Sequence, residues 1–577
     1  MKGRPPESTQ AAADLQAAVP DDRSRRSGVG LGAWMQAGAA LLWLPQAAAL
    51  AWAVQQLSTG AGFRAVVLPA AAVFLLGTLR ALVHAAGSRL TFRAARAQLA
   101  AMRARAVTAI ARRSPVDREK PASGFAASAI GEQAEAVLPY LSRYRPVRLR
   151  TALVPAAILA VVLPLSWLAA LVLLVSAPLI PLFMALIGLR AKEASEVQML
   201  EIGGMNGFLL DRLRGMTTIR ALHATEATAL RLRASAVALK ERTMAVLRIA
   251  FLSSAVLELF SALGVALIAV YVGFHFLGQF PFGAWGGKLT LGEGLFILLL
   301  APTFFEPLRE LATVWHDRAA GEAALGALRG LAGEGDGAML LPGALVAARA
   351  SADTGARALP PAVAVRDLAF RYPGDAENVI DGFSLDVAAG EKVALLGTSG
   401  AGKSTLLALI AGLAGARTGE IAVGGMPLTG DTAASLRGRM AWIGQKPHFF
   451  AGSVARNVTL DRDRIGRADV ARALTLCAIG DRAATRIVGE AGAGLSGGEA
   501  LRLALARAAA DPRADLILAD EPTAHLDSMT AAEVTAGLLQ SAAGRTLIVA
   551  THDPVLAARM DRVVRIGDAA PAGREAS

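Results

Sequence analysis

The sequence predicts a multi-domain chain, in which an all-α membrane domain of six helices is followed by a soluble α/β domain with a largely parallel sheet. The chain has 577 residues, of which 54% are hydrophobic and only 18% are charged. An ordinary soluble domain carries about 25% charged residues, so this composition argues against a fully soluble enzyme. Most of the apolar residues lie before Leu311, whereas short apolar runs alternate with helical stretches after Ala362. The second pattern is typical of an α/β domain.

The chain is basic and contains one cysteine. Lys and Arg number 59 against 47 Asp and Glu, which gives a formal net charge of +12. Such a balance suits nucleic acid, anionic lipid headgroups or loops that set membrane topology, so the position of the charges decides between them. A single cysteine, Cys477, excludes an intramolecular disulfide framework and a Cys-rich zinc site within the chain. We interpret it as an incidental buried thiol.

Six apolar stretches are long enough to be membrane spans, because a helix needs about 20 residues to cross a hydrocarbon core of about 30 Å. The first stretch follows a polar and charged tail over residues 1–30 and lacks a convincing cleavage site. We therefore interpret it as an uncleaved membrane helix rather than a signal peptide. The six predicted spans are Leu31–Leu57, Ala65–Ala86, Tyr144–Leu163, Trp167–Leu189, Ile249–Leu277 and Leu289–Leu308.

Basic residues beside the spans predict their orientation. Arginines are frequent between spans two and three and between spans four and five, whereas the opposite connections offer only Arg64 and Lys288. Because basic loops stay on the cytoplasmic side, both long segments and both chain ends are predicted to be cytoplasmic. The positive charge then needs no nucleic-acid partner. Each long segment has about 60 residues rich in helix formers, so the spans are expected to continue as helices beyond the bilayer.

The apolar pattern ends at a segment rich in Gly, Ala and Pro, residues 333–361, which we interpret as a linker. The predicted domain limits are a cytoplasmic tail over 1–30, a membrane domain with cytoplasmic coupling helices over 31–332, the linker, and a soluble domain over 362–577. The mixed charged and apolar run from Asp211 to Arg220 fits a short coupling helix.

The strongest chemical signal is a glycine-rich run that follows an apolar strand and precedes a helix, which is the context of a P-loop. Glycines let the backbone amides turn toward phosphates, and the helix N-terminus adds its dipole. Lys403 is expected to reach the β and γ phosphates of a nucleotide, and Ser404 to give an oxygen to Mg²⁺. The residues of this predicted site are Gly397, Thr398, Ser399, Gly400, Ala401, Gly402, Lys403, Ser404 and Thr405.

An acidic pair, Asp520 and Glu521, follows a second apolar strand over 516–519. An acidic pair at the end of a strand, far along the chain from a P-loop, suits one carboxylate for magnesium and the other for the attacking water. We therefore predict that Asp520 binds Mg²⁺ and that Glu521 polarises the water. Taken alone, this pair is moderate support for a nucleotide hydrolase.

The run Leu495-Ser496-Gly497-Gly498-Glu499 precedes Asp520 and resembles the signature motif of ATP-binding cassette (ABC) proteins. The resemblance implies an ABC ATP-binding domain and extends to four more positions. It implies that Tyr372 stacks on adenine, that Gln445 is the Q-loop glutamine at the metal, that Asp527 is the D-loop aspartate and that His552 is the switch histidine. The family usually has glutamine where this chain has Glu499, and often a small residue in place of His525. These departures bear on the rate of hydrolysis.

Six spans ahead of one cassette are similar to exporter-type half-transporters, in which the P-loop of one half and the signature motif of the other enclose each ATP. Further runs resemble the CydDC family of heterodimeric thiol exporters. That resemblance implies an inner-membrane exporter with a CydC-like second half, cysteine or glutathione as cargo, haem as a competing cargo, and a role in cytochrome bd assembly. The runs are 177–186, 208–216, 247–254 and 300–309.

Three other functions are open at this point. A membrane-tethered ATPase acting only as a scaffold would not need six spans. An exporter of another small molecule, a peptide or a lipid would share the general features. An importer is disfavoured, because the importer spans and cassettes of the family usually lie on separate chains. The cargo is not readable from the residues, since spans dominated by Ala, Leu and Val fit neither a thiol nor haem cleanly.

Several polar residues lie in or beside the predicted spans. A carboxylate inside a membrane is costly, so Glu258 in span five is a candidate for a substrate or gating role, with helix packing as the alternative. Snorkelling explains Arg80 and His84 at the end of span two. Glu306 and Arg309, one turn apart, are expected to pair. Two histidines are candidate haem ligands but more often act as polar helix ends, namely His275 and His316.

Overall fold

A computed structural model describes residues 22–60, 62–178, 212, 215–280, 282–285, 287–333, 338–344, 360–489, 492–524 and 526–566. The described residues form two compact units. One contains Gly330–Ser577 together with the short segment Val107–Ser123, and the other contains Gly124–Arg329 together with the helices before Val107. The predicted linker and the predicted runs 177–186 and 208–216 lie mostly outside the described residues, and the predicted domain limits stay predictions.

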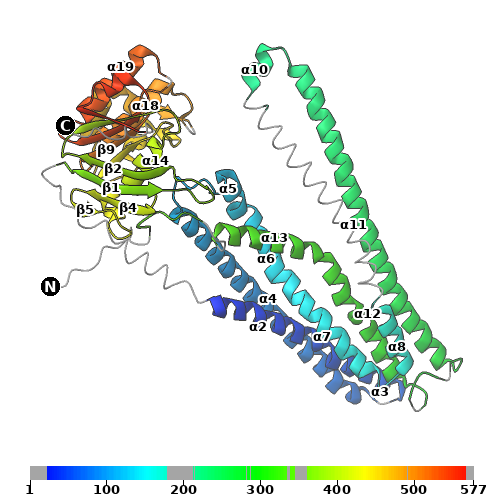
Figure 1. The fold of residues 1–577 in the computed structure, drawn as a ribbon. Coiled ribbons are helices and arrows are strands. Elements are labelled where there is room, and N and C mark those ends of the chain that lie inside the picture. Colours follow the sequence, from blue (N-terminus) through cyan, green and yellow to red (C-terminus); the bar gives the residue numbers. More distant parts are fainter. Residues whose placement is uncertain are drawn as a thin grey trace, which may run out of the picture. The chain divides into compact units, whose positions relative to one another are not determined.

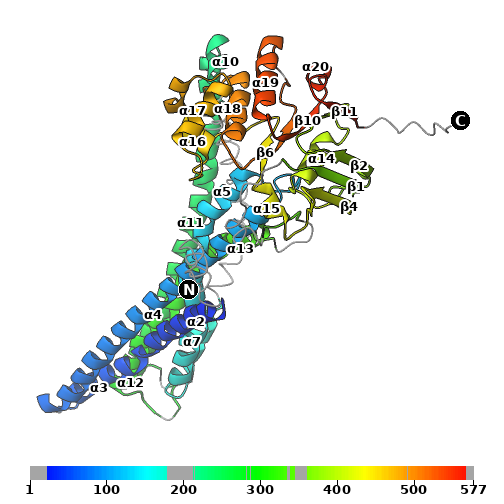
Figure 2. The same cartoon turned by 90° about the vertical axis from the view of Figure 1, so that its left-hand side faces the viewer.

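The second unit is built from helices. Their bounds are α2 (Asp22–Leu41), α3 (Trp43–Ser58), α4 (Phe63–Arg112), α5 (Ser123–Gly131), the 3-10 helix η1 (Gln133–Ala136), α6 (Val137–Pro139), the π-helix η2 (Tyr140–Tyr144), α7 (Arg145–Val162), α8 (Trp167–Ser176), α10 (Met216–Ala221), α11 (Thr225–Phe276), α12 (Leu291–Thr313) and α13 (Trp315–Leu331). Figures 1 and 2 both show α2, α3, α4, α7 and α12 running side by side. The short helix α10 covers the second half of the predicted coupling run, from Met216 to Arg220.

Four helical segments of the described residues are long and apolar enough to cross a membrane: 28–58, 63–112, 255–276 and 291–313. They coincide with predicted spans one, two, five and six. The third predicted span falls on α7, whose first turns carry arginines, and the fourth begins on the short apolar helix α8. The rest of that fourth span lies outside the described residues. Helices α4 and α11, of 50 and 52 residues, continue well past an apolar crossing, as the sequence predicted.

Helices α2 and α4 approach closely because small residues line their contact. A Cβ atom added at Gly32 would meet the backbone oxygen of Gly87 at 2.7 Å. A polar pair spans the same contact, where Gln36 Nε2 donates to Thr91 Oγ1 at 3.1 Å and Thr91 Oγ1 donates to Gly87 O at 2.9 Å. Small residues and interhelical hydrogen bonds are how membrane helices associate, since lipid provides no hydrophobic drive. This contact fixes one wall of the membrane unit.

The other unit contains two main sheets and a small two-stranded one (Figures 1 and 2). The antiparallel sheet has the order β2-β1-β4-β5, and the parallel sheet has the order β11-β3-β10-β9-β6. The strands are β1 (Val363–Phe370), β2 (Ile380–Val387), β3 (Lys392–Leu396), β4 (Thr418–Val423), β5 (Met426–Pro427), β6 (Met440–Ile443), β7 (Gly452–Ser453), β8 (Ile487–Val488), β9 (Leu516–Asp520), β10 (Thr546–Thr551) and β11 (Arg562–Arg565).

Two cores stabilise this unit, because the buried strands of the parallel sheet carry apolar side chains on both faces. One core fills the space between the antiparallel sheet, α14 and the parallel sheet, and the other joins the parallel sheet to the helices that follow β7. The helices and the 3-10 helix η4 are α14 (Lys403–Ile410), α15 (Ala433–Arg437), α16 (Val454–Thr459), α17 (Arg467–Leu476), η4 (Asp481–Thr485), α18 (Gly497–Ala509), α19 (Ser528–Ser541) and α20 (Pro554–Ala557).

The single cysteine belongs to the second of these cores, which agrees with its interpretation as a buried thiol. Cys477 follows α17 and is 2% exposed. Burial raises the pKa of its thiol to about 12, although a hydrogen bond with Ser541 acts in the opposite direction. Because the thiolate is the reactive form of cysteine, this thiol is inert while the unit is folded.

We therefore predict that Cys477 resists a maleimide at pH 7.5 to 8 in the native protein, since both access and thiolate formation are blocked. The same protein unfolded in guanidinium chloride should react fully. Labelling is read as the mass added to the intact chain. Complete modification of the folded protein within minutes would show that this core opens or packs differently.

Candidate functional site

The glycine-rich loop lies between β3 and α14, and its glycines are required by its backbone. Gly400 and Gly402 both have φ of +88°, in the left-handed region that favours glycine. A Cβ atom at Gly397 would meet the carbonyl oxygen of Ile566 at 2.5 Å, so no larger residue fits there. The loop thereby opens directly onto the N-terminus of α14, where free amides and the helix dipole favour a phosphate.

Lys403, the first residue of α14, folds back over this loop. Its side chain is 6% exposed, and its Nζ donates to the carbonyl oxygens of Gly397 at 2.8 Å and Thr398 at 2.9 Å. The next residue, Ser404, donates its hydroxyl to Asp520 Oδ1 at 2.9 Å. The cation and the hydroxyl expected at the phosphates and the metal therefore lie at the same end of the loop.

The parallel sheet brings the other charged groups to this edge. Strand β10 lies between β3 and β9, so the carboxyl ends of all three strands meet. Glu521 follows β9, and its Oε1 lies 3.6 Å from Lys403 Nζ. His552 follows β10, and its Nδ1 lies 2.7 Å from Glu521 Oε2. An ionised carboxylate can only accept hydrogen bonds, so His552 Nδ1 carries the proton in this contact.

Glu521 is held in a strained backbone conformation. Its φ is +50°, which is uncommon for a residue with a side chain, and its N–H donates to Ala550 O at 2.9 Å. The side chain is only 12% exposed. Strain of this kind persists where the surrounding structure fixes the residue, and it gathers at functional sites. The arrangement can hold a carboxylate close to a phosphate-binding lysine, where it can accept a proton from water.

Asp520, the last residue of β9, is 8% exposed. Burial raises the pKa of its carboxyl, and the neighbouring charge of Glu521 acts in the same direction. The hydrogen bond from Ser404 and the charge of Lys403 oppose this rise. Carboxylate and hydroxyl oxygens are the hard ligands that Mg²⁺ prefers, so the pair Ser404 and Asp520 fits the predicted metal. Bound there, Mg²⁺ would neutralise phosphate charge. The hydrogen bond between Ser404 and Asp520 already holds these two oxygen ligands together.

Two further predicted residues lie around this centre. Tyr372 follows β1, and its hydroxyl lies 3.1 Å from Thr405 Oγ1 in the first turn of α14. Gln445 follows β6, the strand beside β9, and its side chain is exposed. The structure therefore joins Tyr372 to the loop by a direct contact and places Gln445 at the end of the neighbouring strand.

The predicted signature motif begins α18. Ser496 caps this helix by accepting from the N–H of Glu499 at 3.2 Å, and Glu499 Oε2 accepts from the N–H of Ser496 at 2.8 Å. Glu499 Oε1 also accepts from Arg486 at 2.7 Å. These contacts lower the pKa of Glu499, the bond from the Ser496 backbone most of all. The glutamate that departs from the family pattern thus completes a capping box, and Arg486 is a partner that the sequence analysis missed.

The two glycines of the motif have different surroundings. A Cβ atom at Gly498 would meet Thr530 Cγ2 of α19 at 2.5 Å, so this position needs glycine for packing. At Gly497 a Cβ atom would meet no described atom within 4 Å. Asp527, the predicted D-loop aspartate, caps α19 by accepting from the N–H groups of Met529 and Thr530. His525 lies outside the described residues.

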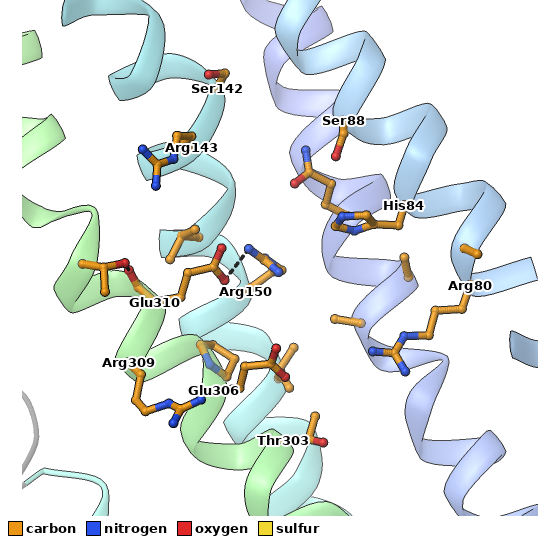
Figure 3. Close-up of a pocket in the computed structure, with 18 of the residues that line it drawn as sticks. Arg80, His84, Ser88, Ser142, Arg143, Arg150, Thr303, Glu306, Arg309 and Glu310 are labelled. Carbon is orange, nitrogen blue, oxygen red and sulfur yellow. Dashed lines mark hydrogen bonds and ion pairs between the residues drawn. The ribbon is translucent and has the colours of Figure 1, made fainter. Parts of the chain in front are cut away.

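The helical unit contains a polar cavity with a volume of about 1060 Å³. Its walls come from α2, α3, α4, η2, α7, α11 and α12. Figure 3 shows His84 and Ser88 of α4 facing Arg150 of α7 and Glu310 of α12 across this cavity. Arg150 pairs with Glu310 at 2.5 Å. Snorkelling, which the sequence suggested for Arg80 and His84, therefore does not account for their positions, since both line the cavity.

The prediction that Glu306 and Arg309 form an ion pair is wrong. Arg309 instead donates to both carboxylate oxygens of Glu258, at 3.1 and 2.9 Å. The partner comes from α11, so a contact between helices replaces the contact within one turn of α12. Glu258 is thus a packing partner and also lines the cavity. Glu306 and Arg80 both line it, and neither forms an ion pair with another described residue; Arg80 lies over the Trp43 ring at 5.1 Å.

The two histidines considered as haem ligands have different environments. His275 is 2% exposed, and its Nε2 accepts from the N–H of Leu289 at 3.1 Å, which is a polar helix-end contact. His316 is exposed on α13. Neither residue lines the cavity.

Comparisons with known proteins match both parts of the chain. The family of the ABC transporter transmembrane region matches residues 43–308, and the ABC transporter family matches residues 380–524. The chain is 34% identical to the glutathione/L-cysteine transport system ATP-binding/permease protein CydD of Escherichia coli strain K12, over 85% of this chain and 82% of that protein. It is 34% identical to the transport ATP-binding protein AarD of Providencia stuartii, over 83% and 80%.

A more distant relative is CydC of Bacillus subtilis strain 168, also described as a glutathione/L-cysteine transport system protein, at 29% identity over 74% of this chain and 72% of that protein. A solved structure of a bacterial Atm1-family ABC exporter with ATP bound matches with a TM-score of 0.67 and 22% identity, over 95% of this chain and 94% of that chain. These findings confirm the predicted fold class and the predicted ATP-driven transport activity.

We predict that Glu521→Gln lowers ATP turnover about 10²- to 10⁴-fold while ATP binding survives, because the amide cannot accept the proton of the attacking water. Lys403→Ala should instead weaken binding, since it removes the cation at the phosphates. Both are measured on the chain purified with the second half that the sequence predicts, by phosphate release and by equilibrium binding of ATP. Turnover that stays intact in Glu521→Gln would assign hydrolysis to the partner half.

Proposed function

The chain belongs to the ABC transporter family as a CydD-type exporter, and we propose that it exports cysteine and glutathione across the cytoplasmic membrane as one half of a heterodimer. ATP bound at the P-loop supplies the driving force. The family and the names of the relatives support thiol transport, and the cavity of the helical unit supports a small charged cargo. The proposed role includes support of cytochrome bd assembly.

The observation that carries the proposal is the charge in the cavity. Its lining contains four arginines and three glutamates, which form two ion pairs with one another, and Arg143 pairs with Asp317 outside the lining. Arg80 and Glu306 remain without a described ionic partner, and Figure 3 shows them extending into the cavity from α4 and α12. Unpaired charges in a membrane domain are costly and are expected to serve a ligand or a pathway.

A zwitterionic amino compound matches these two charges. Its carboxylate suits the guanidinium of Arg80, and its ammonium suits the carboxylate of Glu306. The volume of about 1060 Å³ lies near the upper end of ordinary ligand pockets, so a tripeptide such as glutathione is accommodated as well as cysteine.

The roles proposed for the nucleotide site follow its contacts. The loop residues from Gly397 to Thr405 hold the phosphates, Ser404 and Asp520 hold Mg²⁺ with Gln445, and Tyr372 stacks on adenine. Glu521 polarises the water, and His552 orients Glu521 through the 2.7 Å contact. Ser496, Gly497 and Gly498 complete the ATP site of the partner half. At Gly497 an added Cβ atom would meet no described residue outside its own helix turn within 4 Å, which leaves space for that second nucleotide.

The proposed partner is a CydC-like half-transporter, because each ATP in an exporter is enclosed by two cassettes. The proposed location is the inner membrane, with both chain ends in the cytoplasm. The basic segments between spans two and three and between spans four and five support that orientation.

We predict ATP-dependent uptake of labelled cysteine or glutathione into everted vesicles that contain the chain and its partner. Arg80→Gln and Glu306→Gln should each raise the KM for the thiol about tenfold, since each removes a charge-assisted hydrogen bond of about 1.5 kcal/mol or more. The matched control is Arg89→Gln, a substitution on the same helix at an exposed arginine outside the cavity, which should leave KM unchanged.

Two results would contradict the proposal. The chain expressed without a partner should neither transport nor reach full ATP turnover, so full activity of the isolated chain would exclude the heterodimer. Absence of uptake for both thiols, with turnover stimulated by haem and lost in His84→Ala, would assign haem as the cargo in place of thiols.

The signature glycines allow a separate prediction about the partner. Gly497→Ala should leave the thermal stability of the complex unchanged and lower its ATP turnover about 10²-fold, because the added methyl meets the partner's nucleotide and no described atom of this chain. Gly498→Ala is the contrasting variant, since its methyl collides with Thr530 and should lower stability as well. Full turnover in Gly497→Ala would show that no second site forms against this motif.

A further inference from the structure

Neighbouring side chains cover the ring of Tyr372. The residue is only 7% exposed. Phe370 contacts it edge-on with ring centroids 4.9 Å apart, its hydroxyl lies 3.1 Å from Thr405, and the guanidinium carbon of Arg118 lies 3.9 Å from its ring centroid. A base that stacks on this ring needs an open face of the ring. One of the covering groups therefore has to move before adenine can stack.

Arg118 is the cover that can move. Phe370 is 3% exposed and belongs to the core between the sheets, and Thr405 is 8% exposed in the first turn of α14. The side chain of Arg118 is 61% exposed, and its other recorded partner is Asp375, whose carboxylate lies 3.0 Å from its Nη1. An exposed cation–π contact and an exposed ion pair are each weak, so displacing Arg118 disturbs no core residue.

The segment that carries Arg118 is tied to the nucleotide-binding unit. It directly follows α4. Ser114 donates its hydroxyl to Leu413 O at 2.6 Å, just beyond the end of α14, and its N–H donates to Met339 O at 2.8 Å. Val116 packs against the core between the sheets. The anchor at Ser114 is buried, whereas the tip at Arg118 is exposed, so the tip can change position while the anchor holds.

We propose that Arg118 is a displaceable cover on Tyr372, which occupies the adenine-stacking face and leaves it when the base binds. The inference rests on the assignment of adenine to Tyr372 and goes beyond it, because it makes base binding a competition with a residue of the segment that follows α4. A guanidinium 3.9 Å from the ring centroid leaves no room for a base between them. Arg118 is therefore a positioning residue that lowers the affinity for the base without touching the phosphate site.

The competition couples the base to the segment that follows α4. Binding of the base shifts the segment toward the position in which Arg118 has left the ring. By linkage, any movement of the tip that withdraws Arg118 raises the affinity for the base by the same factor. The residue that covers the ring therefore lies six positions beyond the end of the helix that is predicted to form span two.

The test uses the chain assembled with its partner. Photolabelling by 8-azido-ATP reads the base site of this chain alone when the partner carries a tag that separates the two halves on a gel. Arg118→Ala should make ATP about three- to tenfold better as a competitor of labelling, which corresponds to loss of one weak cation–π contact and one weak ion pair. Inorganic tripolyphosphate, which has no base, should compete equally in Arg118→Ala and in the unchanged protein.

The matched control is Lys120→Ala, which removes a cation of the same segment that bonds Pro115 O and does not contact Tyr372; neither competitor should change. Asp375→Asn removes only the ion pair, so it should also make ATP a better competitor of labelling, but by a smaller factor than Arg118→Ala. If ATP competes less well in Arg118→Ala than in the unchanged protein, Arg118 supports the base and the proposed cover is wrong. If ATP competes equally in all variants, the proposed cover is also wrong. If ATP competes equally well in Tyr372→Ala, adenine does not stack on Tyr372 and the premise of the proposed cover is wrong. That result would leave the conclusion of the thiol-transport assay unaffected.

Discussion

The nucleotide site depends on one constraint, the parallel pairing of β3, β10 and β9. Because β10 pairs in parallel with both neighbours, Thr551 lies opposite Leu396 and Ala550 lies opposite Asp520. The residues that follow each of these three strands must then lie at the same edge of the sheet. This register places a lysine, a carboxylate and an imidazole within direct contact, although they come from three separate connections. A shift of one residue in any strand would turn alternate side chains to the other face and separate them.

The sequence predicts this part of the molecule well, since its information is local. A P-loop is a contiguous run, and the strands before it and before Asp520 are contiguous apolar runs, so their order and their ends can be identified without the fold. The contact between Ser404 and Asp520 follows once both strands are known to be parallel. The predicted positions for the P-loop, the acidic pair and the histidine are therefore brought together, while their proposed chemical roles stay predictions.

Contacts between distant elements were not predictable in the same way. Spacing along α12 suggested that Arg309 pairs with Glu306, but a residue on another helix, Glu258, competes for the same guanidinium and takes it. Spacing gives only the candidates within one helix, and tertiary packing decides between these and the candidates on neighbouring helices. The same limit applies to Arg118, whose contact with Tyr372 joins residues far apart in the chain. Glu499 shows the local counterpart, where a departure from the family pattern still satisfies a helix cap.

The cavity shows why composition alone was a poor guide to cargo. Spans dominated by Ala, Leu and Val contain few polar residues, and an average over the spans therefore suits no charged ligand. The fold gathers those few residues from seven helical segments into one lining. Ion pairs within the wall offset the desolvation free energy of most of its charges. The charges without an ionic partner are therefore the ones that indicate the charge of the ligand. Arg143 pairs with Asp317 outside the lining, so among the described lining residues Arg80 and Glu306 are left without an ionic partner. A zwitterion would compensate both charges at once, whereas a cargo with one sign of charge would leave the other uncompensated in an apolar domain.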